Sequence, residues 1–349
     1  MVRAARNETA LTDTDLAWCH ATVPAVSRTF AITIDVLDEP MSSRICIGYL
    51  ICRIADTIED AQHIPPAAKV DLLGRFDDVL DPDAPTDAQT FVDDVSTWAP
   101  DDPGPEWRLV AETPRVMRTF EDTTTATRTA MRGPMRELVQ GLGLFVDRHA
   151  STEGLRIRTC SELEEYCHYA AGTVGELITN LTVLGADVDA DELRDRGHAF
   201  GTLLQLVNIA KDVYDDFETE NNVYLPSSWL AEAGVDQEAV CDSEHRSASA
   251  TVVRRTVAHA RTFADDAEAY LHNAPFQNDR GLAAWGIPFL LAIGTMRELT
   301  ARPAAAVAPG AVKIDRTEVL AIIEAVTADP TPETVSELRA AVADGPLSP

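Results

Sequence analysis

The chain has 349 residues, and 45% of them are hydrophobic, which is ample for a sizeable core. Its formal net charge of −28 argues against nucleic acid and anionic membrane surfaces as partners. Of its 29 basic residues only three are lysine (Lys69, Lys211 and Lys313). An acidic excess with so little lysine is typical of a protein adapted to a salt-rich cytoplasm.

Apolar residues recur at helical spacing along nearly the whole chain, and no run alternates as a strand would, so we predict an all-α fold. We expect a helix break at Val23-Pro24, and a surface excursion with a short helix over the proline-rich stretch Asp81–Pro105. Ser161 and Glu164 have the spacing of a capping box. The expected helices are Asp13–His20 with Asp13 as its cap, Ser27–Leu37, Met41–Ala61, Ala67–Val79, Ala88–Trp98, Pro105–Asp122, Ala126–Arg148, one from Ser161, Asp189–Glu218, Ala248–His272, Arg280–Thr300, Asp315–Ala328 and Pro332–Val342.

We find no internal repeat, so one all-α domain spanning residues 1–349, with a polar N-terminal tail over about residues 1–12, is the economical interpretation. The six cysteines form no C-x-x-C pair, which favours buried reduced thiols in a cytoplasmic protein. The N-terminus has no hydrophobic signal core, and no run of 18 apolar residues exists, so we expect no transmembrane anchor.

The first acidic motif lies within the predicted helix Met41–Ala61. Tyr49, Arg53, Asp56 and Asp60 are spaced by four, three and four residues, so they share one face, with Glu59 beside them. Their neighbours are apolar, which predicts the polar lining of a buried site. The alternative is an internal ion pair between arginine and aspartate, but one arginine cannot neutralise three carboxylates.

The second acidic motif has the same arrangement about half the chain away. Gln205, Asn208, Asp212 and Asp216 are spaced by three, four and four residues on one helix face, and the flanking residues are apolar. The alternative is an exposed helix end whose acids are solvated. Finding both motifs in one chain favours two carboxylate faces that oppose each other and hold Mg²⁺ against a phosphate ester, because Mg²⁺ prefers oxygen ligands.

Two further segments carry weaker signals. Ser27, Arg28 and Phe30 bring together a hydroxyl, a guanidinium suited to phosphate and an aromatic ring, although serine at a helix start is also a common cap. Tyr166 leads directly into a run of small residues that includes Gly172 and Gly175. Glycine is unfavourable within a helix, so these positions indicate either space for a long apolar ligand or close helix packing.

These motifs resemble those of the squalene/phytoene synthase family, the head-to-head trans-prenyl transferases, and within it those of squalene synthases (farnesyl-diphosphate farnesyltransferases). The resemblance covers about residues 22–319. Its motifs are SRTF at Ser27, YLICRIADTIED at Tyr49, EYCHYAAGTVG at Glu165, LLQLVNIAKDVYDD at Leu203 and GAVKIDR at Gly310.

The resemblance implies an isoprenoid-synthase helical bundle around a central cavity, with prenyl diphosphates as substrates and Mg²⁺ and NADPH as cofactors. It implies Asp56, Glu59, Asp60, Asp212 and Asp216 as metal ligands, the four aspartates also serving catalysis with Tyr166 as acid/base or cation-stabilising group. It assigns diphosphate contacts to Ser27, Arg28, Arg53 and Lys211, the remaining lining of the substrate site to Phe30, Tyr49, Gln205 and Asn208, and NADPH phosphate contacts to Lys313 and Arg316.

The expected reaction joins two farnesyl diphosphates through a cyclopropylcarbinyl diphosphate, which NADPH then reduces to squalene. The chain departs from eukaryotic squalene synthases at Lys211, where they carry arginine, and at Glu220–Val223, where they carry a Gly-Gly-Arg flap. Two alternatives remain open. One is a phytoene or dehydrosqualene synthase that takes a longer substrate or omits the reduction, and the other is a non-catalytic, acidic, helical cation-binding protein. If the protein is such an enzyme without a membrane anchor, we expect it to contact the membrane peripherally when it releases its product.

Overall fold

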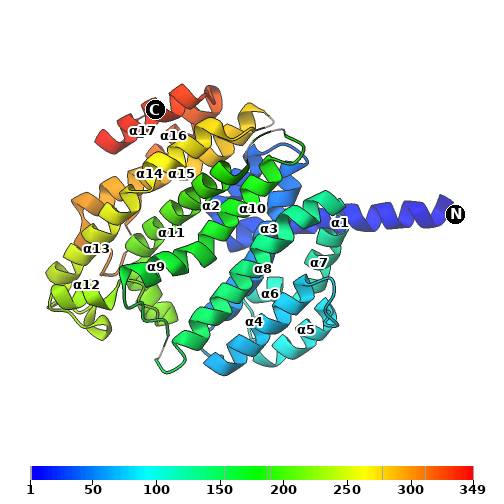
Figure 1. The fold of residues 1–349 in the computed structure, drawn as a ribbon, viewed down its shortest axis with the longest axis horizontal. Helices are drawn as coiled ribbons and strands as arrows, with labels where there is room; N and C mark the ends of the chain where they lie inside the picture. The colour runs from blue at the N-terminus through cyan, green and yellow to red at the C-terminus, as the bar shows by residue number, and fades with distance from the viewer. Residues whose placement is uncertain are drawn as a thin grey trace. The chain divides into compact units, whose positions relative to one another are not determined.

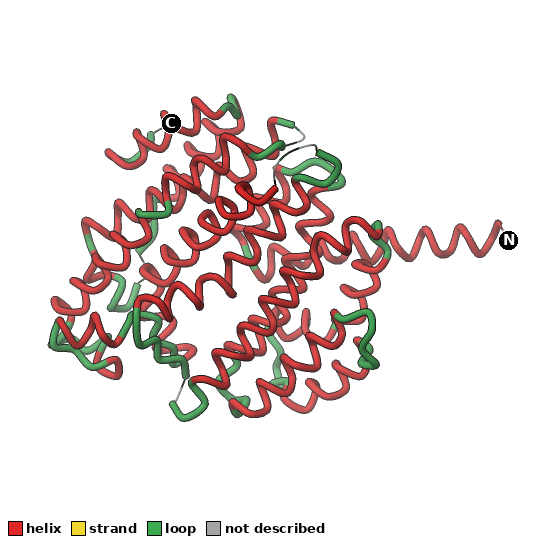
Figure 2. Tube along the Cα trace, in the orientation of Figure 1, coloured by secondary structure: helices red, strands yellow, loops and turns green. Residues whose placement is uncertain are grey.

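The structure, a computed structural model, describes residues 2–152, 154–186, 188, 190–276, 278–310 and 312–348. The side chains of residues 2–13, 28 and 29 lie outside the described part. Within the described ranges the protein is helical and has no strand, apart from one isolated parallel bridge between Arg156 and Val223 (Figure 2). The all-α prediction is therefore confirmed.

The chain divides into two compact units, Met1–Asp147 and Arg148–Pro349. Each unit consists of helices that pack around a central helix of its own (Figure 1). The expectation of one domain stays a prediction.

Unit 1 is organised around α3, which packs against helices α1, α2, α4, α6 and α7. It ends with α8, a long helix whose buried face includes Met131, Leu138 and Phe145. The helices of unit 1 are α1 (Val2–Val26), α2 (Arg28–Val36), α3 (Met41–Asp60), α4 (Pro66–Leu80), α5 (Ala88–Val95), α6 (Pro105–Ala111), α7 (Thr113–Glu121) and α8 (Thr125–Arg148), with a short 3₁₀ turn η1 (Ser96–Trp98).

Unit 2 is organised around α11, which packs against α9, α10, α13, α14 and α15. Its helices are α9 (Cys160–Cys167), α10 (Thr173–Thr182), α11 (Ala190–Glu220), α12 (Ser227–Glu232), α13 (Arg246–Arg261), α14 (Ala264–Asn273), α15 (Asp279–Ala301), α16 (Arg316–Ala328) and α17 (Pro332–Asp344). A π-helical turn, η2 (His168–Gly172), joins α9 to α10, and two short 3₁₀ turns are η3 (Gln237–Ala239) and η4 (Pro303–Ala305).

Three local expectations are wrong. Helix α1 continues through Pro24 to Val26, with the Ser27 N–H donating to Val23 O (2.7 Å), because a proline in a last turn leaves the following bonds intact. It also begins at Val2, so Asp13 is not its cap; the Asp13 side chain lies outside the described residues. Helix α9 is capped by Thr159, whose hydroxyl accepts from the Glu162 N–H (3.2 Å), rather than by Ser161.

Helix α15 is long and apolar enough to cross a membrane by length and composition alone, although the chain has no run of 18 apolar residues. The expectation of no transmembrane anchor stays a prediction. Yet 78% of its apolar stretch is buried inside the protein, and it carries Trp285, Phe289 and Leu290 into the core. Such burial is what the core helix of a folded domain shows.

Candidate functional site

The first acidic stripe, which we define as Tyr49, Arg53, Asp56 and Asp60, lies on the central helix of unit 1. From Ile45 to the end of α3, every residue is buried except these four, which are partly exposed. The three-and-four spacing therefore places all four polar side chains on the one face of α3 that is not packed.

The carboxyls of this stripe are unfavourably placed as anions. Loss of solvation raises the pKa of Asp56 to about 7, with a contribution from the negative charge of Asp60, although Arg53 counteracts both. Loss of solvation also raises the pKa of Asp60, against the effects of Arg53, Glu59 and Lys69. One guanidinium is thus insufficient to stabilise both charges, and a bound cation would relieve the cost.

Arg53 has hydrogen-bonding capacity left over. Its Nε is buried without a hydrogen-bond partner, and its Nη2 is 4.0 Å from Glu106 Oε1 on α6, beyond hydrogen-bond distance. Burial acts to lower the pKa of Arg53, but attraction to Asp56, Tyr49 and Asp60 raises it overall, so the side chain stays cationic. A buried, unpaired guanidinium N–H is a suitable donor for a phosphate oxygen.

The start of α2 packs against the first stripe. Ser27 caps α2 by accepting from the Phe30 N–H (3.2 Å), as the alternative interpretation of this serine as a helix cap expected. The Phe30 ring stacks on Tyr49 with centroids 4.3 Å apart, and the Tyr49 hydroxyl donates to Val26 O (3.5 Å). Ser27, Phe30 and Tyr49 are therefore brought together, whereas the Arg28 side chain lies outside the described residues.

Glu59 differs from the other acids of the first motif. Its side chain is only 5% exposed, and it hydrogen-bonds the Asp60 carboxyl, while its backbone carbonyl accepts from Lys69. Its role as a metal ligand stays a prediction.

The second acidic stripe, which we define as Gln205, Asn208, Asp212 and Asp216, lies on the central helix of unit 2. Asn208 is exposed and the other three are partly exposed. Five apolar residues between them are buried (Leu206, Val207, Ile209, Ala210 and Val213). The stripe is thus polar and solvent-reachable beside the packed apolar face of the helix.

Charge near the second stripe is partly compensated. Lys211 Nζ lies 3.0 Å from Asp212 Oδ2, which places a cation beside the first aspartate of the motif. Asp215 and Glu218 are exposed, as the solvated-end alternative expected for these two acids.

Tyr166 is buried near the end of α9 and is held by residues that the sequence did not single out. Its hydroxyl donates to the Tyr224 hydroxyl (3.2 Å), and the two rings lie with centroids 4.8 Å apart. Asn222 Nδ2 donates to the same Tyr224 oxygen (3.2 Å), and Asn222 Oδ1 accepts from the Leu155 N–H (2.8 Å). These contacts fix the position of the Tyr166 hydroxyl.

The loop after α11 is anchored rather than flap-like. Asn221 ends the helix with φ of 53°, a left-handed conformation that asparagine tolerates. The buried Arg156 guanidinium donates to Asn221 Oδ1 (2.8 Å) and to Glu238 Oε1 (2.7 Å). The sequence could have predicted this helix end from the pair Asn221-Asn222, because asparagine just after the last helical residue is typical of a helix stop.

The glycines after Tyr166 serve helix packing, so the interpretation as open space is wrong for them. A Cβ on Gly175 of α10 would lie 2.0 Å from the backbone oxygen of Gly197 on α11. A Cβ on Gly172 would lie 2.4 Å from His198, whose Nε2 is 2.9 Å from His168 Nδ1. The two helices thus touch backbone to backbone at this point, which only glycine permits.

Arg316 is the first residue of α16 in unit 2, Lys313 lies just before this helix, and both are exposed. The Asp315 carboxylate between them caps α16 by accepting from the Thr317 N–H (2.7 Å), an interaction that lowers the pKa of Asp315. The negative charge between the two basic residues is therefore used for helix capping. The NADPH contacts of Lys313 and Arg316 stay a prediction.

The comparisons with known proteins agree with these motifs. The family model for squalene/phytoene synthases matches residues 23–318, so the chain belongs to the squalene/phytoene synthase family. It is 24% identical to the squalene synthase of Schizosaccharomyces pombe over 82% of this chain and 60% of that protein. It is 25% identical to that of Candida albicans over 86% of this chain and 65% of that protein. The family resemblance is confirmed; the salt-adapted origin stays a prediction.

Solved structures give the same result for the fold. A complex of TcSQS with a ligand matches with a TM-score of 0.80 and 25% identity over 95% of this chain and 90% of that chain. A dehydrosqualene synthase complex matches with a TM-score of 0.59 at 17% identity over 95% of this chain and 98% of that chain, a likeness of fold alone. The isoprenoid-synthase helical fold is therefore confirmed. The chain spans 41–65% of the length of the first three curated relatives.

Proposed function

We propose that this chain is a Mg²⁺-dependent squalene synthase. It would join two farnesyl diphosphates head to head through a cyclopropylcarbinyl diphosphate and reduce the product with NADPH to squalene. The observation that carries the proposal is the first acidic stripe. Two of its carboxyls have raised pKa values, and beside them Arg53 keeps an unpaired buried N–H, within a region matched by the family model.

The donor set of both motifs fits Mg²⁺, because it consists of carboxylate oxygens and the raised pKa values of Asp56 and Asp60 leave them short of positive charge. When bound, Mg²⁺ would polarise the diphosphate leaving group. We assign the ligands to five residues (Asp56, Glu59, Asp60, Asp212 and Asp216). The expectation that the two stripes act on one diphosphate belongs to this proposal.

The substrate contacts follow from the same residues. Arg53 offers its unpaired Nε–H to a diphosphate oxygen, and Lys211 supplies a second cation beside Asp212. The stacked pair of Phe30 and Tyr49 offers aromatic faces to a prenyl chain or an allylic cation. Ser27 and Arg28 would add diphosphate contacts, and Gln205 and Asn208 would complete the polar lining.

Tyr166 is the candidate for moving a proton or stabilising positive charge. Its hydroxyl is already held by Tyr224, so it needs little reorganisation during the reaction. Lys313 and Arg316 are exposed cations suited to the phosphates of NADPH, which would supply hydride to the second half of the reaction.

The test is direct. Purified protein at high salt is incubated with labelled farnesyl diphosphate and Mg²⁺, with and without NADPH, and the hydrocarbon is identified. Squalene formed only with NADPH supports the proposal. Release of diphosphate without any condensed product contradicts it.

A second candidate is a dehydrosqualene or phytoene synthase. It is favoured by the anchored Asn221-Asn222 loop, which stands where eukaryotic squalene synthases carry a basic flap. In the same assay it gives an unreduced product whether or not NADPH is present, or it prefers geranylgeranyl diphosphate. An unchanged turnover in the Asp56→Asn/Asp212→Asn double variant would instead indicate that the acidic motifs only bind structural cations.

A further inference from the structure

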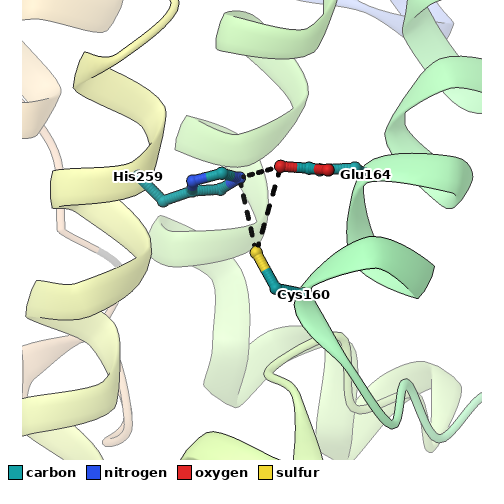
Figure 3. A group of neighbouring side chains, drawn as sticks. All are labelled: Cys160, Glu164 and His259. Carbon is teal, nitrogen blue, oxygen red and sulfur yellow. Dashed lines mark hydrogen bonds and ion pairs between the residues drawn. The ribbon is translucent and has the colours of Figure 1, made fainter.

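A further cluster of side chains with metal-ligand donor atoms lies in unit 2 and shares no residue with the acidic stripes. Cys160 is the first residue of α9, Glu164 follows one turn later on the same face, and His259 reaches them from α13 (Figure 3). The proposed reaction uses none of these three residues. They supply one sulfur, one nitrogen and one oxygen, a mixed donor set that the Mg²⁺ motifs lack.

The separations between the three donor atoms are close to those of a tetrahedral zinc site. Cys160 Sγ is 3.7 Å from His259 Nε2 and 4.0 Å from Glu164 Oε1, and His259 Nε2 is 2.9 Å from Glu164 Oε1. With usual zinc–ligand bond lengths, tetrahedral geometry places these pairs about 3.6, 3.6 and 3.4 Å apart. Each pair therefore needs to move by about 0.5 Å or less to accept the ion.

The surroundings orient the histidine and leave an approach from solvent. The His259 ring lies edge-on to Trp229 and to Phe263, with centroids 6.1 and 5.5 Å away. Trp229 is in turn covered by the Arg255 guanidinium, 4.4 Å from its centroid. The Glu164 side chain is 46% exposed and that of His259 19%, so an ion and a water ligand can reach the cluster.

We propose that Cys160, Glu164 and His259 bind one Zn²⁺ or a similar borderline divalent ion, with a water molecule as fourth ligand. On binding, the Cys160 thiol releases its proton to solvent, and the His259 imidazole uses the Nε2 lone pair with its proton on Nδ1. Thiolate and imidazole ligands select Zn²⁺ and Co²⁺ over Mg²⁺, so this site and the acidic stripes would not compete for the same ion.

The ion would link the start of α9 to α13. Tyr166 lies on α9 only six residues after Cys160, so the bound metal would stiffen the helix that carries the candidate catalytic tyrosine. This inference stands independently of the proposed function, because metal binding here needs no prenyl substrate.

Co²⁺ is the probe, because a thiolate ligand gives it an intense near-ultraviolet charge-transfer band. The full-length protein is freed of metal with a chelator, reduced, and titrated with Co²⁺ in excess Mg²⁺. We expect one equivalent to produce the band, and Zn²⁺ to abolish it by displacement. Cys160→Ser should eliminate the band, and His259→Gln should weaken Co²⁺ binding about 100-fold.

Matched controls separate this site from other thiols and from misfolding. Cys241→Ser and His245→Gln change a partly exposed cysteine and histidine elsewhere in unit 2 and should keep the band and the affinity. Far-ultraviolet circular dichroism checks that every variant is folded. A wild-type protein without the band, or a band that survives Cys160→Ser, would overturn the proposal and leave a simple His259–Glu164 ion pair.

Discussion

The raised pKa of Asp56 predicts that this residue destabilises the metal-free protein at neutral pH. The pKa is about 7 in the folded protein against an ordinary value of 3.8. Below pH 3.8 the carboxyl is protonated in both states and has no effect. Between these values the folded state holds a proton that the unfolded state releases, so stability falls as pH rises, and above pH 7 the full cost remains.

The magnitude follows from the two pKa values. Their difference corresponds to about 4 kcal/mol in the free energy of unfolding, and the partial exposure of Asp56 reduces this to about 2–4 kcal/mol. Asparagine has nearly the shape of the neutral carboxyl and cannot ionise. Asp56→Asn should therefore match the wild type near pH 3 and exceed its stability by about 2–4 kcal/mol at pH 8.

The assay is urea unfolding followed by circular dichroism, in chelator and at constant salt, from pH 3 to pH 8. Asp35→Asn, an exposed aspartate on α2 in the same unit, is the control and should keep the wild-type pH dependence. Added Mg²⁺ should stabilise the wild type at pH 8 more than Asp56→Asn, because the proposed ion site includes the ionised Asp56 carboxyl. An Asp56→Asn profile parallel to that of the wild type would refute the reasoning.

Three other substitutions test separate parts of the structure. Gly175→Ala should lower the free energy of unfolding by about 3 kcal/mol or more, since its Cβ would lie 2.0 Å from Gly197 O. The control Gly74→Ala, whose Cβ would have no atom within 4 Å, should raise the free energy of unfolding by about 0.5–1 kcal/mol in the same urea titration. Asn222→Ala leaves the buried Leu155 N–H and one Tyr224 contact unmade and should cost about 2–3 kcal/mol; an unchanged melting temperature would contradict this. Arg53→Gln should lower kcat/KM for farnesyl diphosphate about 100-fold, equivalent to about 2.7 kcal/mol, as measured by release of labelled diphosphate, and Arg75→Gln on the surface of α4 should not.

What the sequence could predict were features set by local periodicity. The helical class and both acidic stripes followed from spacings of three and four, and every partly exposed position of α3 after Ile45 was found in this way. The contact between Tyr166 and Tyr224 was missed because it joins residues 58 positions apart, which periodicity cannot relate. Gly175 was ambiguous for the same reason, since its partner, Gly197, lies on another helix.

The direct backbone contact between α10 and α11 has a mechanical consequence. Flexible side chains between helices usually allow the helices to shift slightly against each other. At Gly175 and Gly197 no side chain separates the two backbones. A displacement of α11, which carries Asp212 and Asp216, would therefore press directly on α10, which the π-helical turn joins to the helix of Tyr166. Within unit 2 this contact therefore links the position of the helix that carries Asp212 and Asp216 to the position of the Tyr166 hydroxyl.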